Sequence, residues 1–88
     1  ILFSSIKLSS FFAYPLMTLI SVPSSVTSIE NSAFDRCYLL SQVIIPVSVT
    51  SISEYAFDGC PSLIQISIPE TLMINHISID SRIEITRF

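Results

Sequence analysis

The stretch PVSVTSISEYAFDGCPSLIQISI, residues 46–68, repeats the pattern of the stretch before it, PSSVTSIENSAFDRCYLLSQVII, residues 23–45. About half of the aligned columns are identical, and two more pair apolar residues. Self-similarity at a fixed 23-residue period predicts stacked units, each covering the hydrophobic face of its neighbour. The identical columns are Pro23/Pro46, Ser25/Ser48, Val26/Val49, Thr27/Thr50, Ser28/Ser51, Ile29/Ile52, Ala33/Ala56, Phe34/Phe57, Asp35/Asp58, Cys37/Cys60, Leu40/Leu63 and Gln42/Gln65.

The same register extends outward in both directions. Pro69 falls one period after Pro46 and Leu72 occupies the Val column, but beyond it the pattern weakens. The places of Ile, Ala and Phe are taken by Asn75, Ile79 and Asp80. Towards the N-terminus, five apolar columns are filled by Ile6, Phe11, Met17, Ile20 and Val22. The chain therefore divides into a degenerate repeat at 1–22, repeats at 23–45 and 46–68, and a degenerate or truncated repeat at 69–88.

Residues 1–22 allow a second interpretation. The apolar run Phe11–Ile20 follows a lone Lys7, as in a secretory signal peptide. The run is too short to cross a bilayer as a helix, which needs about 20 apolar residues, so no membrane insertion is expected. A signal peptide has no reason to keep the 23-residue phase, and this favours the degenerate repeat.

The sequence of each unit predicts two extended segments joined by turns. Residues 40–45 and 63–68 are β-rich runs that stop at a proline, which cannot donate to a strand ladder. Residues 26–29 and 49–52 place two small hydroxyl residues between apolar ones and form the return side. The segment Ala-Phe-x-x-Cys spaces its Phe and Cys as one turn of helix or 3-10 helix requires to point both inward.

Stacking the units builds continuous apolar columns that no single unit could bury. The main columns are Val26/Val49, Ile29/Ile52, Phe34/Phe57 and Leu40/Leu63. Because each unit contacts only its neighbours, the ends of the stack need a polar capping unit or the neighbouring repeats of a longer chain. The sequence shows neither a Cys-rich cap nor a charged terminal helix.

The unit I-x-I-P-x-S-V-T-x-I-x-x-x-A-F-x-x-C-x-x-L, carried by residues 22–40 and 45–63, resembles the BspA-like, or Treponema pallidum-type, leucine-rich repeat. The resemblance implies a right-handed β-rich solenoid of about three and a half repeats, with a parallel sheet on the concave side and short extended or 3-10 segments opposite. It also implies a surface or secreted protein that binds extracellular-matrix or other cell-surface proteins. The chain departs from the family at Glu30 and Ser53, where glycine is usual, so that turn must form without a residue that readily takes positive φ.

Composition excludes several function classes. The 88 residues are 50% hydrophobic and 12% charged with a net charge of -3, and their four basic residues are scattered singly, so no nucleic-acid surface is expected. A single glycine excludes a glycine-rich phosphate loop. We expect no catalytic residues, no cofactor and no metal site, and hence no enzyme.

The candidate reactive residues are better explained structurally. Cys37 and Cys60 share one column, so they are interpreted as small buried residues, although neighbouring coils lie close enough for a disulfide of suitable geometry. The redox compartment therefore stays open. His76 is the only histidine, and a catalytic triad drawn with nearby Ser78 and Asp80 lacks any nucleophile motif.

The expected binding surface is the outward face of the parallel sheet. Its columns are Leu19, Gln42 and Gln65, and Ser21, Ile44 and Ser67. Solenoids commonly bind partners on such a face, while the alternative is a merely solvated strip, since no Trp or Arg cluster marks it. Tyr38 and Tyr55 are further exposed aromatic candidates.

Two other functions remain open. The chain could be a scaffold or regulatory segment of a larger intracellular signalling protein, or a decayed fragment without a function of its own. The weakened pattern after Leu72 motivates the last alternative.

Overall fold

The computed structural model describes residues 5–6, 18–34 and 36–88. Their strands are β1 (Ser5–Ile6), β2 (Leu19–Ser21), β3 (Ser28–Ile29), β4 (Gln42–Ile44), β5 (Ser51–Ile52), β6 (Gln65–Ile68) and β7 (Glu84–Arg87), and these described residues contain no helix. Phe11, Met17 and Lys7 lie outside the described residues, as does most of the segment for which a signal peptide was considered.

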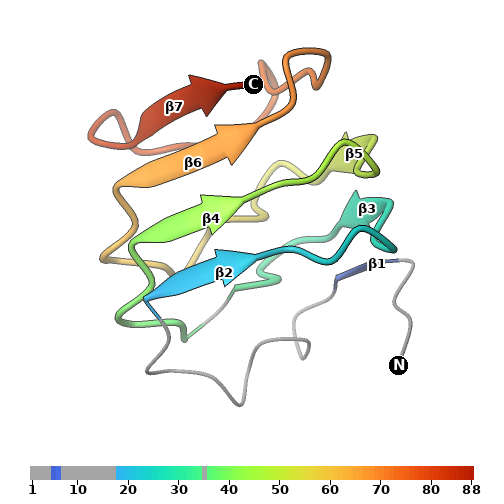
Figure 1. The fold of residues 1–88 in the computed structure, drawn as a ribbon. Helices are drawn as coiled ribbons and strands as arrows, with labels where there is room; N and C mark the ends of the chain where they lie inside the picture. The colour runs from blue at the N-terminus through green and yellow to red at the C-terminus, as the bar shows by residue number, and fades with distance from the viewer. Residues whose placement is uncertain (1–4, 7–17, 35) are drawn as a thin grey trace.

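The strands form two parallel sheets that run along the stack of coils. One sheet has the order β2-β4-β6-β7, and the other has the order β1-β3-β5 (Figure 1). Leu19 pairs with Gln42 and Gln42 pairs with Gln65, so the strand register follows the 23-residue sequence repeat. The fold class expected from the repeat, a β-rich solenoid with a parallel sheet, is confirmed, and the extended return segments pair into a sheet of their own.

The core lies between the two sheets. Every strand residue that faces it in β2 to β6 is buried and apolar, and none of the polar side chains that the structure describes is buried with them. The core residues are Ile20, Val22, Val26, Ile29, Ala33, Phe34, Cys37, Leu40, Val43, Ile45, Val49, Ile52, Ala56, Phe57, Leu63, Ile66, Ile68 and Leu72. The apolar columns expected from stacking are therefore present.

The phenylalanine column is the most direct evidence of stacking. The rings of Phe34 and Phe57 lie parallel, with 5.6 Å between their centroids and 3° between their planes. The separation and orientation are those of an aromatic pair in adjacent coils, as the 23-residue register requires. The expectation that Phe34 lies over Phe57 is confirmed.

The two Ala-Phe-x-x-Cys segments close their turns with different hydrogen bonds, and in the second segment the Asp58 N–H donates to the Tyr55 carbonyl at 3.1 Å. The Cys37 N–H donates to the Phe34 carbonyl at 3.2 Å, an i to i+3 bond of the 3-10 type that is not continued into a helix. Positive φ occurs at Ser32, Arg36 and Gly59, with values of 55°, 64° and 87°. The turn after the T-S-I segment is thus made with ordinary φ at Glu30, and the left-handed residue comes two positions later, at Ser32.

The last coil is shorter than the others. The register that pairs Gln42 with Gln65 would place the next partner 23 residues after Gln65. Gln65 instead pairs with Glu84, which lies four positions earlier than that. The bond from Ile83 N to the Asp80 carbonyl repeats the bond from Leu63 N to the Cys60 carbonyl, so Asp80 takes the place of Cys60. The simple 23-residue register had placed Asp80 in the phenylalanine column. The hydrogen bonds show instead that this coil has no phenylalanine position.

Candidate functional site

The six residues expected on the binding face lie on one side of the sheet formed by β2, β4, β6 and β7. In β2 and β4 the outer residues are exposed and the central one is buried, and in β6 Gln65 and Ser67 are half-buried. The strand pairing places Leu19, Gln42 and Gln65 in one row and Ser21, Ile44 and Ser67 in the next. Strand alternation therefore brings the six residues together as one surface, called the sheet face below.

Side-chain amides are ordered along the first row. The Gln42 Nε2 donates to Gln65 Oε1 at 2.9 Å, and the Gln65 Nε2 donates to Thr86 Oγ1 at 3.3 Å. The side-chain amides of Gln42 and Gln65 thus point in the same direction along the stack of coils. On the same face Leu19 is 45% exposed and Ile44 is 37% exposed, so apolar and amide groups alternate on this surface.

The sheet face extends one strand further than the sequence pattern indicated. Glu84 pairs with Gln65 and Thr86 pairs with Ser67, so both residues continue the outward rows. Glu84 and Thr86 were not predicted from the sequence, because the 23-residue register places β7 four residues too late in the chain. The alternation of apolar residues in Ile83-Glu84-Ile85-Thr86 was the signal that could have located this strand.

The two tyrosines singled out from the sequence are exposed but do not belong to the sheet face. Tyr38 is 56% exposed and Tyr55 is 48% exposed, and both lie in turns between strands. The backbone of Tyr55 is held on both sides, since Asn31 Oδ1 accepts its N–H at 3.2 Å and Ser32 N–H donates to its carbonyl at 2.9 Å. The ring is thus presented from a fixed turn.

Cys37 and Cys60 are thiols and are not joined by a disulfide. Cys37 is fully buried and Cys60 is half-buried. The Cys60 Sγ lies 3.2 Å from the Phe34 carbonyl, so this thiol donates across to the preceding coil. Cys37 thus occupies the core position expected of a small buried residue, whereas Cys60 in the same column is only half-buried.

His76 has a structural position. Its Nε2 lies 2.7 Å from the Ile52 carbonyl, and because a carbonyl oxygen only accepts, Nε2 must carry a proton. One coil earlier, the Ile29 carbonyl accepts from the backbone N–H of Ser53 at 2.8 Å. The His76 imidazole therefore takes the role in the last coil that the Ser53 N–H has in the coil before it. It does so at the end of the smaller sheet, β1-β3-β5. Among the described residues no serine hydroxyl bonds to His76.

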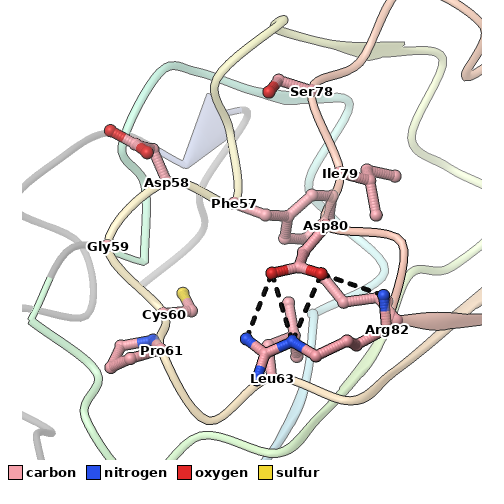
Figure 2. A pocket seen from close by; sticks show the side chains of 11 residues that line it. Phe57, Asp58, Gly59, Cys60, Pro61, Leu63, Ser78, Ile79, Asp80 and Arg82 are labelled. Carbon is pink, nitrogen blue, oxygen red and sulfur yellow. Dashed lines mark hydrogen bonds and ion pairs between the residues drawn. The ribbon is translucent and has the colours of Figure 1, made fainter.

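Asp80 and Arg82 form the ion pair at the rim of a pocket in the last coil (Figure 2). The Arg82 backbone N–H donates to Asp80 Oδ1 at 2.9 Å, and the guanidinium Nη2 donates to Oδ2 at 3.1 Å. The backbone bond and then the guanidinium bonds hold the pKa of the Asp80 carboxyl below its usual range. Both side chains are open to solvent, so the pair contributes little to stability.

Within the described part of the chain, no group of three or more His, Cys, Asp or Glu side chains is arranged to hold a metal ion. A search of the same residues finds no helix long and apolar enough to cross a membrane.

Coils stacked in parallel register with a shared phenylalanine column define this chain as a leucine-rich-repeat solenoid. A family model described as a BspA type leucine rich repeat region of six copies matches residues 4–84. Because the match covers most of the 88 residues, the chain belongs to the BspA-type leucine-rich-repeat family. The resemblance found in the sequence motif is thereby confirmed. No curated protein and no solved structure matches the chain.

Proposed function

We propose that this chain is a non-enzymatic protein-binding module and that its partner binds the sheet face. The proposal extends to a role in adhesion or host interaction at the cell surface or in secreted form, with an extracellular-matrix or cell-surface protein as the partner. Membership of the BspA-type repeat family supports a repeat module for protein interaction. The single observation that carries the choice of surface is the set of six side chains aligned on one exposed face.

The chemistry of the sheet face suits a protein partner. None of the six residues is charged, so the surface lacks the basic groups that nucleic acids require. Leu19 and Ile44 supply apolar area that a partner can cover, while the amides and hydroxyls offer both donors and acceptors. This mixture of apolar and neutral polar groups is typical of protein interfaces.

The amide row also lowers the cost of binding. Gln42 and Gln65 are held by their mutual hydrogen bond before any partner arrives. Ordering a flexible side chain at an interface costs about 0.5–1.5 kcal/mol. The bond between Gln42 and Gln65 orders these side chains in advance and so removes part of that cost. The sheet backbone beneath the row is fixed by the parallel ladders.

The proposal is tested by placing a charge at the centre of the sheet face. The chain and its Ile44→Arg variant are passed over a panel of immobilised extracellular-matrix proteins, and binding is measured by biolayer interferometry. We expect at least one protein to bind the unaltered chain and the variant to bind it at least about tenfold more weakly, because an unpaired charge would be desolvated in the contact.

Ser51→Arg is the matched control, because Ser51 is an exposed strand residue of the other sheet. Its binding should stay within about twofold of the unaltered chain. Equal losses in the two variants would show that the sheet face is not the binding surface. Retention by none of the matrix proteins would overturn the adhesion role.

A further inference from the structure

The first row of the sheet face begins at an apolar side chain and ends at a carboxylate. It consists of side chains that pair in turn across β2, β4, β6 and β7 (Figure 1), namely Leu19, Gln42, Gln65 and Glu84. Neighbouring strands lie about 4.8 Å apart, so about 14 Å separates the Leu19 position from the Glu84 position. The two ends of the row therefore differ in chemistry and lie a fixed distance apart.

The carboxylate of Glu84 is exposed and is not neutralised within the described part of the chain. Arg82 is engaged by Asp80, and the Arg87 Nη1 donates to two backbone carbonyls at 3.1 and 3.0 Å. The six residues of the sheet face, together with Glu84 and Thr86, include no basic side chain. The surface thus carries one negative charge that is left for a partner.

The middle of the first row is neutral and ordered. The Gln42 amide donates to Gln65 at 2.9 Å, and the Gln65 amide donates to the Thr86 hydroxyl at 3.3 Å. Because the Thr86 hydroxyl accepts this bond, its own proton remains to be donated beside Glu84. Only the ends of the row therefore distinguish one orientation of a bound partner from the reverse.

We propose that the partner contacts this row with an extended segment that places a Lys or Arg side chain over Glu84 and an apolar side chain over Leu19. The inference rests on the proposed function and names the partner chemistry for the same surface. A basic side chain complements the single carboxylate, and the reversed orientation would bury that carboxylate under an apolar group. Leu19 is 45% exposed and offers the apolar area at the other end.

The length of the row sets the spacing of the two side chains in the partner. An extended segment rises about 3.3 Å per residue and alternates its sides, so residues four positions apart face the same way about 13 Å apart. On one face of a helix, side chains recur after about seven or eleven positions, which is about 10 or 16 Å. The distance of about 14 Å between the strands of Leu19 and Glu84 fits the extended segment better.

The test is the selection of a phage-displayed library of random linear peptides on the immobilised 88-residue chain. Peptides that also bind the Ile44→Arg variant are removed, so that those retained depend on the sheet face. We expect the retained peptides to share a Lys or Arg four positions from an apolar residue. Their affinities are then measured by fluorescence anisotropy for the unaltered chain and for charge variants.

Glu84→Gln should weaken the binding of a retained peptide about three- to tenfold, as the loss of one charged contact implies. Glu70→Gln is the matched control, because Glu70 is an exposed carboxylate in the turn after β6 and does not belong to the row. It should leave binding within about twofold. Added salt should weaken binding to the unaltered chain more than binding to Glu84→Gln, because salt screens the contact that the variant has lost.

Two kinds of result would overturn the proposal. Retained peptides without the basic residue, or equal binding to Glu84→Gln and Glu70→Gln, would show that Glu84 does not select the partner, while the sheet face would still be the binding surface. Retained peptides that are helical by circular dichroism would exclude the extended segment. A library that yields no peptide sensitive to Ile44→Arg would overturn the proposed function together with this inference.

Discussion

At the scale of single residues, the repeat tolerates different side chains in one demanding backbone position. Arg36 and Gly59 are equivalent, and both have positive φ, at 64° and 87°. The value at Arg36 lies within the narrow left-handed region open to residues with a Cβ, whereas the value at Gly59 lies beyond it. The sole glycine of the chain is therefore required where it stands.

This predicts opposite responses to the same substitution. Gly59→Ala should lower the free energy of unfolding by about 1–2 kcal/mol, because its Cβ would clash with the backbone at this φ. Arg36→Ala is the control, since a residue with a Cβ already adopts the conformation there, and its change should be clearly smaller. Urea unfolding followed by far-UV circular dichroism measures both. Similar losses would mean that φ at Gly59 is not what limits the turn.

At the scale of elements, the smaller sheet is completed at one end by a side chain. Its strands are two residues long, so β5 offers few backbone groups to a further neighbour. His76 satisfies the Ile52 carbonyl at the position where a following strand would donate its N–H. An unsatisfied carbonyl at this partly buried place would cost free energy comparable to a lost hydrogen bond.

Removing this donor should destabilise the end of the sheet. His76→Ala is expected to lower the free energy of unfolding by about 1 kcal/mol, the usual net contribution of one hydrogen bond. His76→Gln retains an N–H donor at a similar reach and should recover most of the loss. Urea midpoints of the two variants give the comparison, and equal midpoints would show that the bond to Ile52 is not maintained in solution.

How far the sequence predicts the structure also depends on the element. The strands β2, β4 and β6 and the face of Gln42 and Gln65 could be predicted, because proline and alternating apolar residues fix both register and direction there. β7 and the pocket beside Phe57 could not. A shortened coil moves the register by four residues, and sequence columns alone do not reveal which hydrogen bonds are kept. The role of His76 depends on the same information.

At the scale of the whole molecule, the coils share one apolar core. Every described coil contributes to the same cluster of buried residues, and the half-buried isoleucines of the last coil pack against it. None of the described coils has a separate hydrophobic core of its own. The stack should therefore unfold as one unit rather than coil by coil.

Phe34→Leu tests this cooperativity. The smaller side chain should lower the free energy of unfolding by about 1 kcal/mol, and the transitions seen by far-UV and near-UV circular dichroism should still coincide. Val47→Ala is the control, because Val47 is 76% exposed and its change should stay within about 0.5 kcal/mol. Two separate transitions in the unaltered chain would show that the coils unfold independently.

The cross-coil hydrogen bonds have a consequence for how the chain folds. The bonds from Gln42 to Gln65 and from Ser41 to Thr18 keep the same 23-residue separation, as the ladders of the larger sheet do up to β6. The entropy lost in closing a loop depends on its length, so each new coil closes at about the same cost as the one before it. Formation of the first coil pair should then be the slow event, and lengthening such an array would add contacts without slowing any single closure.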